Sequence, residues 1–303
     1  MNFLSQLEAP LVVVNKEKLP PATRFVLGGM GGSRLPAEFF RAAHSNISVH
    51  VWKSYGLPLE APEDALYVAS SYSGETKETL SFFEEALARG LPLVAITGGG
   101  TLLGKTKDRK IPHIVIPFDT NVPARRMLPV ALRALSLIVM KKDDSICEGF
   151  TAAERSGAYA RGALLSGAIP AGATPVFYAS EKNAIMAEHA KIEVAETAHT
   201  PASANVFPEF LHNELAAYAR ENTHTTPVFI FDPADDERAV KDARHAMRFL
   251  EKKGYAPVAI ELTERGRASV LAENCLLTQG LADALARDRV PTSDFMREFR
   301  KEE

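Results

Sequence analysis

The feature that most constrains the fold of this chain is an alternation of short apolar runs with longer helical patterns. In the first half the runs are Phe25–Leu27, Ile47–Trp52, Ala65–Ala69, Leu93–Ile96 and Ile114–Ile116. Short continuous runs are typical of strands buried on both faces, and such burial requires helices on both sides of a parallel sheet. The first half is therefore predicted to be a doubly wound α/β domain.

The segments between these runs have helical patterns. One apolar stripe within residues 76–89 consists of Leu80, Phe83 and Leu87. Gly90 follows this stripe and is predicted to end the helix. A second helix is predicted over residues 127–142, where an apolar segment ends in two lysines, as the C-terminus of a helix favours.

The alternation stops at Lys141–Asp144 and then resumes, which suggests a linker region and a second domain. Further strands are predicted at residues 176–179, 228–231 and 258–260, and helices at residues 181–196, 237–253 and 269–286. We therefore predict two doubly wound parallel-sheet domains, residues 1–147 and 148–303. The two halves share the alternation of strands and helices but show no clear internal sequence repeat.

Composition excludes several classes of protein. The formal net charge of the 303 residues is −3 and no run of Lys or Arg stands out, so neither nucleic acid nor an anionic membrane is an expected partner. No signal peptide is evident, and no apolar run approaches the roughly 18 residues that cross a bilayer, so we expect a soluble cytoplasmic protein. Cys147 and Cys275 lack metal-ligand spacing and are interpreted as small core residues.

Two loops rich in glycine and hydroxyl residues follow predicted strands. They are Gly28-Gly29-Met30-Gly31-Gly32-Ser33 and Ser70-Ser71-Tyr72-Ser73-Gly74-Glu75-Thr76. Glycines let backbone N–H groups approach an anion, the N-terminus of the following helix attracts negative charge, and Ser33 is suited to capping its helix. Either loop alone fits a tight turn with a helix cap equally well, but together they predict a phosphate pocket. The second half has Ser180-Glu181-Lys182 after its first strand, so one phosphate site per chain is expected.

The same two loops resemble those of the sugar isomerase (SIS) domain. The match consists of Gly-Gly-Ser followed by Ser-Tyr-Ser-Gly-Glu-Thr-Lys-Glu-Thr. The resemblance implies that the phosphate ligands are Ser33, Ser71, Ser73 and Thr76, in a pocket that Gly31 and Gly32 complete.

The second half resembles one branch of that family, the bifunctional phosphoglucose/phosphomannose isomerases. The match runs from Glu196 through Pro201 and Pro208-Glu209 to His212-Asn213-Glu214, and Tyr55–Pro58 extends it to the first half. The resemblance implies an aldose–ketose isomerase that interconverts fructose 6-phosphate with glucose 6-phosphate and mannose 6-phosphate through a cis-enediolate. It implies no cofactor or metal, and a homodimer in which His212 reaches the site of the other subunit.

Within this resemblance three residues have catalytic roles. Glu196 is the base that moves a proton between C1 and C2, and His212 is the acid/base that opens the sugar ring, a task suited to a group that titrates near neutrality. Arg125, four residues before Pro129, is the cation that stabilises the anionic enediolate, and Arg126 is an alternative.

The chain departs from the family pattern at several positions. Thr197 and His199 stand where the family usually has Asn and Lys, and Pro123-Ala124 precede the arginine in place of Gln-Pro or Pro-Pro. The family's C-terminal lysine, which assists ring opening, aligns with Arg300, and Lys301 is adjacent. Arginine stays charged and is a poor acid, so Arg300 is better suited to binding a sugar hydroxyl.

Two other functions fit parts of the pattern. A sugar-phosphate sensor without activity would keep the phosphate loops, but it has no need of a base beside C2. A different SIS enzyme, such as an amino-sugar phosphate isomerase or an etherase, would lack the long segment from Glu196 to His212. His189 and Glu193 have the i, i+4 spacing of metal ligands, but no third ligand is evident, so we interpret them as a plain helix face.

Overall fold

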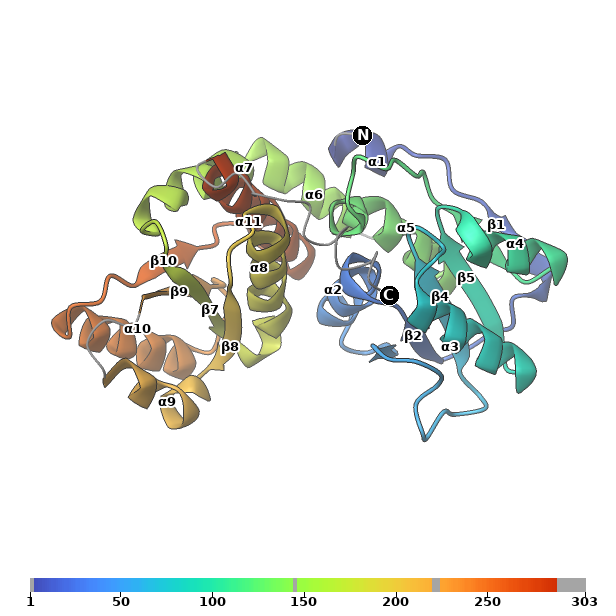
Figure 1. Cartoon of the computed structure of the whole chain (residues 1–303), viewed down its shortest axis with the longest axis horizontal. Helices are drawn as coiled ribbons and strands as arrows, with labels where there is room; N and C mark the ends of the chain where they lie inside the picture. The colour runs from blue at the N-terminus through green and yellow to red at the C-terminus, as the bar shows by residue number, and fades with distance from the viewer. Residues whose placement is uncertain (1–2, 144–145, 220–223, 288–303) are drawn as a thin grey trace, which may run out of the picture. The chain divides into compact units, whose positions relative to one another are not determined.

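The computed structural model describes residues 3–143, 146–219 and 224–287 (Figure 1). The chain divides into two compact units, Met1–Thr151 and Ala152–Glu303, called unit 1 and unit 2 below. The division falls within helix α6 (Ile146–Arg155), a few residues after the position expected from the sequence. Each unit has a central sheet covered by helices, which confirms the predicted α/β class.

Unit 1 contains a six-stranded sheet in the order β1-β6-β5-β4-β2-β3. Its strands are β1 (Val13–Val14), β2 (Arg24–Gly28), β3 (Ser48–Trp52), β4 (Leu66–Ser71), β5 (Leu93–Thr97) and β6 (His113–Val115). Every pair is parallel except β1 with β6. Gly28 pairs with Ala69, so the two loops that follow β2 and β4 begin side by side at one edge of the sheet.

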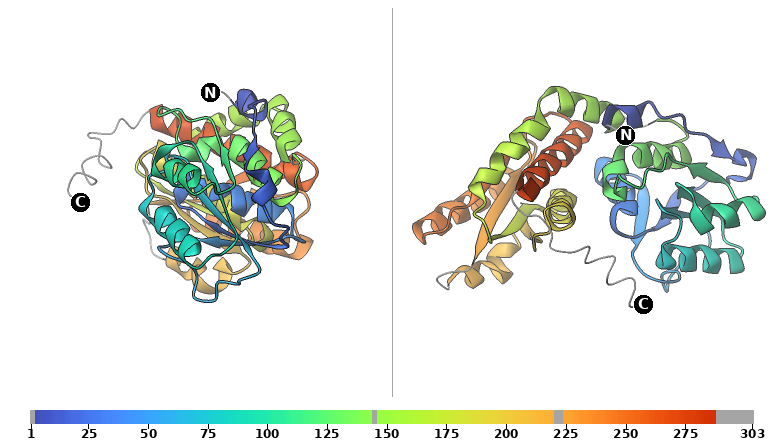
Figure 2. Two further views of the ribbon diagram at one scale, coloured as in Figure 1. Left: turned by 90° about the vertical axis from the view of Figure 1, so that its right-hand side faces the viewer. Right: turned by 45° about the horizontal axis from the view of Figure 1, so that its top comes forward.

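The helices of unit 1 cover both faces of this sheet. They are α1 (Phe3–Leu7), α2 (Leu35–Ala43), α3 (Lys77–Ala88), α4 (Gly100–Asp108) and α5 (Leu128–Val139). The crossovers from β2 to β3 and from β4 to β5 run in opposite directions along the sheet, and right-handed crossovers then place their helices on opposite faces. Accordingly α2 packs against α5, whereas α3 packs against β4 and β2, an arrangement that can be followed in Figures 1 and 2.

The buried stripe of α3 differs from the predicted one. Its buried residues, at i, i+3, i+4 and i+7, are Thr79, Phe82, Phe83 and Ala86. Leu80 and Leu87 are only partly buried, because the ring of Phe82 occupies the core beside Tyr67. The predicted end of the helix is confirmed, since Gly90 has a φ of +65° and directly follows the C-cap residue.

Unit 2 contains a four-stranded parallel sheet in the order β10-β9-β7-β8. Its strands are β7 (Thr174–Ser180), β8 (Ser203–Phe207), β9 (Thr225–Phe231) and β10 (Val258–Glu261). The sequence did not predict β8, because its residues Ser-Ala-Asn-Val-Phe form no continuous apolar run. This edge strand lies inside the segment from Glu196 to His212, which carries the predicted proton-transfer residues.

The remaining helices of unit 2 also lie on both faces of its sheet. They are α7 (Ala158–Leu165), α8 (Ala184–Thr197), α9 (Phe210–Asn213), α10 (Glu237–Lys252) and α11 (Arg267–Arg287). α11 packs against α7 and α8 (Figure 1). A methyl group on Gly162 would lie 1.8 Å from the carbonyl oxygen of Leu277, so glycine is required for the close approach of α7 and α11.

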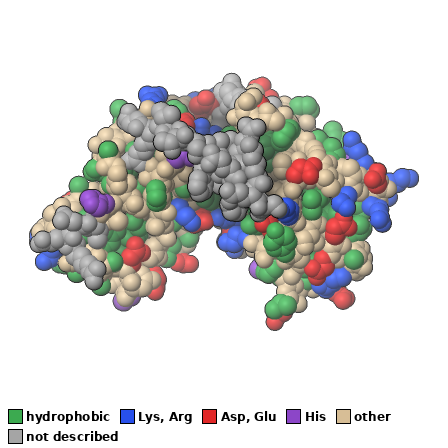
Figure 3. All heavy atoms as spheres, viewed as in Figure 1, with side chains coloured by type: hydrophobic (Ala, Val, Ile, Leu, Met, Phe, Trp, Pro, Cys, Tyr) green, Lys and Arg blue, Asp and Glu red, His purple; other side chains and the backbone are tan. Residues whose placement is uncertain are grey.

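The surface agrees with the modest net charge. On the face drawn in Figure 3, acidic and basic side chains are interspersed over both units. Within the described residues, no helix is long and apolar enough to cross a membrane. Cys275 is fully buried as expected, whereas Cys147 is only half-buried, so its predicted place in the core is wrong.

Candidate functional site

The glycine-rich turn after β2 packs tightly against the segment that contains Arg125. Gly31–Ser33 form a 3₁₀ turn, and Ala124–Met127 form another. A Cβ on Gly32 would lie 2.2 Å from the backbone nitrogen of Arg125, so only glycine permits this contact. Arg125 is 7% exposed. Two parts of the predicted site, far apart in the sequence, are therefore adjacent in unit 1.

Ser33 joins the two predicted phosphate loops. Its hydroxyl accepts a hydrogen bond from the backbone N–H of Tyr72 at 3.0 Å, and its carbonyl accepts one from the Ser70 hydroxyl at 2.9 Å. The predicted N-cap role of Ser33 is wrong, because Arg34 occupies that position and the Ser33 side chain is turned toward the second loop. The structure thus brings the hydroxyl-rich loops together in one place.

The second loop folds around the hydroxyl of Ser71. This hydroxyl accepts a hydrogen bond from the Gly74 N–H at 3.0 Å and shares another with the Thr76 hydroxyl, also at 3.0 Å. The Ser73 hydroxyl accepts from the Glu75 N–H at 3.2 Å and is exposed. Thr76 directly precedes α3, so these hydroxyls gather at the N-terminus of a helix, where an anion is favoured.

A third turn, which was not predicted from the sequence, supports the second loop. It follows β5 and has the sequence Thr97-Gly98-Gly99-Gly100-Thr101. The Glu75 carboxylate accepts hydrogen bonds from the Thr101 backbone N–H at 2.6 Å and the Thr101 hydroxyl at 2.8 Å. Gly74 has a φ of +74°, and a Cβ there would lie 1.9 Å from the Gly99 carbonyl oxygen. The run of three glycines after the predicted strand was the feature of the sequence from which this turn could have been predicted.

Tyr72 links the second loop to the segment after β6. Its hydroxyl accepts a hydrogen bond from the Asp119 N–H at 2.8 Å, and its ring lies 4.9 Å from that of Phe118. Burial raises the pKa of this phenol above its ordinary value. A cavity of about 410 Å³ adjoins this segment, and its lining residues are Pro117, Phe118, Asp119, Thr120 and Met127.

The two proposed proton-transfer residues lie in unit 2. Glu196 is exposed in the last turn of α8, and His212 is exposed in α9. Arg300 and Lys301, the candidates for the C-terminal cation, lie outside the described residues. The predicted phosphate loops and Arg125 therefore belong to unit 1, whereas the candidate base and the candidate ring-opening group belong to unit 2.

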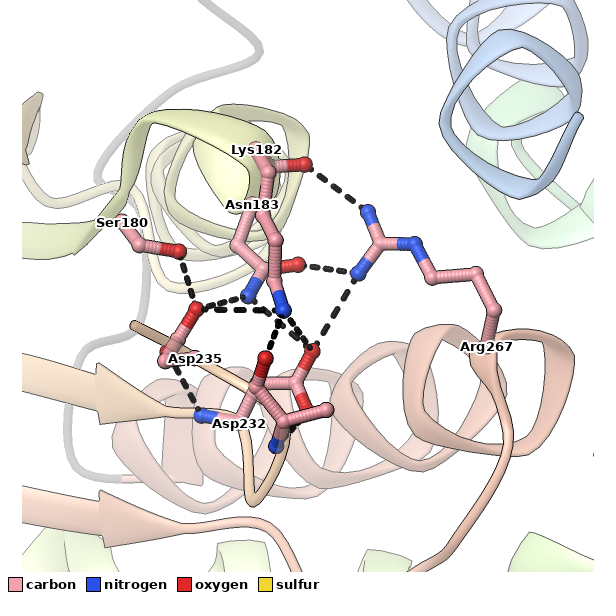
Figure 4. Close-up of polar contacts among 7 residues, drawn as sticks. Ser180, Lys182, Asn183, Asp232, Asp235 and Arg267 are labelled. Atoms are coloured by element: carbon pink, nitrogen blue, oxygen red, sulfur yellow. Dashed lines mark hydrogen bonds and ion pairs between the residues drawn. The ribbon is translucent and has the colours of Figure 1, made fainter. Parts of the chain in front are cut away.

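The carboxyl ends of β7 and β9 in unit 2 hold a network of charged side chains (Figure 4). Arg267 lies 3.3 Å from an Asp232 carboxylate oxygen, and Asn183 donates to Asp235 at 2.9 Å. Lys182 lies 3.6 Å from both carboxylates. Burial lowers the pKa of Arg267, and the nearby carboxylates oppose that shift. Two carboxylates and two cations are thus paired at this edge. The expectation of one phosphate site per chain stays a prediction.

The pair at i, i+4 on α8 is not a solvated helix face. His189 and Glu193 are fully buried, and Nδ1 of His189 lies 2.9 Å from the Thr278 hydroxyl of α11. The packing of α8 against α11 buries this side of the helix, so the helix face that the two residues share is turned toward the core. Within the described residues, no group of three or more His, Cys, Asp or Glu side chains is arranged to hold a metal ion.

Comparison with known proteins agrees with this fold. Residues 167–287 match the family model for the "Bacterial phospho-glucose isomerase C-terminal SIS domain". A hypothetical protein from Thermus thermophilus has a similar structure, with a TM-score of 0.70 and 20% identity over 95% of this chain and 85% of that one. That likeness supports the fold.

Curated relatives identify the family. A bifunctional phosphoglucose/phosphomannose isomerase from Aquifex aeolicus is 28% identical over 80% of this chain and 78% of its own. One from Pyrobaculum calidifontis is 30% identical over 88% of this chain and 84% of its own. A D-glucosamine-6-phosphate 4-epimerase from Sulfolobus acidocaldarius is also similar, at 27% identity over 71% of each chain. This chain therefore belongs to the bifunctional phosphoglucose/phosphomannose isomerase family and is a sugar-phosphate isomerase.

Proposed function

We propose that this enzyme interconverts fructose 6-phosphate with glucose 6-phosphate and mannose 6-phosphate by proton transfer through a cis-enediolate. The observation that carries the proposal is the assembly in unit 1, where Ser33 joins two hydroxyl-rich loops and Gly32 contacts the backbone of Arg125. This assembly offers donors for a phosphate dianion and a cation nearby. Membership of the family supports the reaction.

The phosphate of the substrate is proposed to bind at the N-terminus of α3. Ser33, Ser71, Ser73 and Thr76 supply hydroxyls, and Gly31 and Gly32 let the backbone approach the anion. The hydroxyls of Ser71 and Thr76 bond to each other at 3.0 Å. Because a hydroxyl proton can rotate, each group can exchange this bond for one to a phosphate oxygen without movement of the loop. Binding energy at this end of the sugar then helps to orient C1 and C2.

Ring opening is the first chemical step in the direction from aldose to ketose. Protonated His212 donates a proton to the ring oxygen as the C1–O5 bond breaks, and the C1 hydroxyl loses its proton as the C1 carbonyl forms. The net result is transfer of one proton from O1 to O5. A histidine is suited to both halves of this exchange, because it can donate and accept near neutral pH.

Isomerisation follows in the open-chain sugar. The Glu196 carboxylate takes the proton from C2, the electron pair forms the C1–C2 double bond, and the carbonyl oxygen becomes an enediolate oxygen that the Arg125 guanidinium stabilises. A proton moves from O2 to O1, and Glu196 returns its proton to C1 to give the ketose. Return of the proton to either face of C2 in the reverse direction gives glucose 6-phosphate or mannose 6-phosphate. The proposed route uses no metal and no cofactor.

The test is turnover of fructose 6-phosphate by wild type and by Glu196→Gln, followed by NMR of the products. We expect wild type to form both C2 epimers in the presence of a chelator. Loss of the base should reduce kcat by about 10²–10⁴-fold, because general acid–base steps contribute about that much. Binding of fructose 6-phosphate, measured by calorimetry, should persist in the variant.

Anomer exchange separates the roles of Glu196 and His212. An enzyme that opens and recloses the ring of glucose 6-phosphate also interconverts its α and β anomers, a process that exchange NMR measures directly. Glu196→Gln should retain this exchange, whereas His212→Gln should lose it together with isomerisation. Binding without turnover by wild type would instead favour a sensor, and products altered at C4 would favour an epimerase. The cytoplasmic location and the homodimer stay predictions.

A further inference from the structure

The segment that carries His212 is anchored to the sheet of unit 2 through Glu214. One carboxylate oxygen of Glu214, Oε1, accepts a hydrogen bond from the Tyr178 hydroxyl at 2.6 Å. The other, Oε2, accepts one from Asn205 Nδ2 at 2.5 Å. Tyr178 lies on β7 and is fully buried, and Asn205 lies on β8. Both oxygens of a side chain two residues after His212 are therefore bonded to strands.

The direction of the hydrogen bonds around Tyr178 follows from which of the three groups carry a proton to donate. An ionised carboxylate only accepts, so the single hydroxyl proton of Tyr178 points to Glu214. The Tyr218 hydroxyl, 2.8 Å from that of Tyr178, must then be the donor in their mutual bond. Burial raises the pKa of Tyr178 strongly and that of Tyr218 to about 12, so both phenols keep their protons at neutral pH.

The orientation of Asn205 is fixed independently of Glu214. Its Oδ1 accepts a hydrogen bond from the backbone N–H of Val206 at 2.8 Å, so its amide nitrogen faces Glu214. Glu214 consequently meets one donor at each oxygen. Only a carboxylate accepts at both positions, because a glutamine in the same place would present one acceptor and one donor. The site is thus matched to Glu and mismatched to its closest uncharged analogue.

The apolar side of α9 packs against β7 and β9. Phe210 is fully buried, and its ring lies 4.7 Å from that of Tyr178 and 5.6 Å from that of Phe229. The backbone N–H of Glu214 donates to the Phe210 carbonyl at 2.9 Å and closes the turn. Phe210 and Glu214 therefore flank His212 on the chain and attach the turn at both ends, while the imidazole itself stays exposed.

We propose that Glu214 is a positioning residue for His212, with the Tyr178 and Asn205 donors holding the turn in the register that ring opening requires. The proposal deepens the proposed function and rests on the assignment of His212 to ring opening. Misplacement of a catalytic group by about 1 Å can lower a rate by about 10²-fold, so loss of one bond at Glu214 acts on kcat. The phosphate loops belong to unit 1, and KM should change little.

The first experiment compares Glu214→Gln with wild type. We expect kcat for isomerisation and the rate of glucose 6-phosphate anomer exchange to fall together, by about 10–100-fold, with KM within about threefold. If Glu214→Gln does not fold, Tyr178→Phe replaces it, because that change removes one donor and leaves the carboxylate bonded to Asn205. Tyr255→Phe is the matched control, since this hydroxyl donates to the Tyr218 carbonyl at 3.2 Å without reaching Glu214.

The second experiment reverses the donor and acceptor at one contact. Asn205→Asp combined with Glu214→Gln keeps the net charge and restores a donor–acceptor pair, with the glutamine amide now donating to the aspartate. We expect the double variant to regain most of the kcat and anomer exchange lost in Glu214→Gln. A general loss of stability would not lower kcat and anomer exchange while leaving KM unchanged. The melting temperatures of all variants are measured to detect such a loss.

The outcomes separate this inference from the proposed function. No turnover by wild type would overturn the proposed function itself. An active wild type with a folded Glu214→Gln variant of normal kcat and normal anomer exchange would overturn the positioning role alone. A fall in kcat with anomer exchange intact would also contradict it, because the defect would then lie in a step other than ring opening. Equal loss of kcat in Tyr255→Phe would count against it as well.

Discussion

At the scale of single residues, Gly32 has the strictest requirement in the predicted phosphate pocket. A methyl group there would lie 2.2 Å from the Arg125 nitrogen and 2.6 Å from the Ala124 carbonyl carbon, both of which are backbone atoms that cannot rotate away. We expect Gly32→Ala to lower the free energy of unfolding by about 1–3 kcal/mol and to raise KM for fructose 6-phosphate. Urea unfolding and steady-state kinetics measure the two effects.

Gly31→Ala is the matched variant, because the two glycines are adjacent and serve the same turn. Gly31 has a φ of +49°, and a Cβ added to it would have no heavy atom within 4 Å. Alanine there meets open space and carries only the cost of a left-handed backbone, about 1–2 kcal/mol. A rise in KM as large for Gly31→Ala as for Gly32→Ala would show that contact with the Arg125 segment is not what shapes the pocket.

The sequence indicated which residues form the predicted site better than it indicated which of them contact one another. The hydroxyls of Ser33, Ser71 and Thr76 indicated a phosphate site because they follow glycines and buried strands. Sequence spacing did not indicate that the Ser33 hydroxyl would bond to Tyr72, because that bond joins residues 39 positions apart. It also did not indicate that Arg34, and not Ser33, would be the N-cap residue of the helix. Contacts between loops depend on the register of β2 with β4, which pattern alone does not define.

At the scale of elements, the second of the predicted phosphate loops is bonded to the start of α4. The Glu75 carboxylate bonds to the Thr101 backbone N–H and hydroxyl at the N-terminus of that helix, at 2.6 and 2.8 Å. We expect Glu75→Ala to lower the free energy of unfolding by about 1 kcal/mol through loss of this cap and to raise KM several-fold with little change in kcat. Steady-state kinetics with fructose 6-phosphate and urea unfolding test both expectations.

Glu84→Ala provides the control for that experiment. Glu84 also connects α3 to α4, through an ion pair with Lys105 at 2.5 Å, and both side chains are more than 40% exposed. An exposed pair of this kind contributes about 0–1 kcal/mol, and it lies along the helices away from the loop. KM should therefore stay at the wild-type value in Glu84→Ala. Equal KM values for Glu75→Ala and wild type would show that α4 does not hold the loop in its binding conformation.

Two of the elements that were not predicted from the sequence, α4 and β8, share a physical cause. α4 begins with Gly100 and has little apolar periodicity, and β8 is an edge strand that begins Ser-Ala-Asn and has only two large apolar residues, at its end. Both are defined by tertiary contacts: α4 by Glu75, and β8 by its parallel pairing with β7. Long buried strands such as β4 and β9 were predicted because their burial on both faces leaves a continuous apolar run.

At the scale of the whole molecule, the question is which chain supplies His212 to the site that contains Glu196. The resemblance predicts a homodimer in which the histidine crosses to the partner subunit. A shared site of this kind has a consequence that a site within one chain lacks, because two inactive variants can then complement each other. Glu196→Gln and His212→Gln form the required pair, since each removes a different group.

Subunit mixing tests this arrangement directly. When the two variants are unfolded together at equal concentration and refolded, about half of the dimers should contain one chain of each kind. One of the two sites in such a dimer combines an intact Glu196 with an intact His212, and the other lacks both. We therefore expect about a quarter of the wild-type kcat per chain in the mixture. Sites formed within one chain would leave the mixture as inactive as either variant alone, and refolded wild type measures the recovery of the procedure.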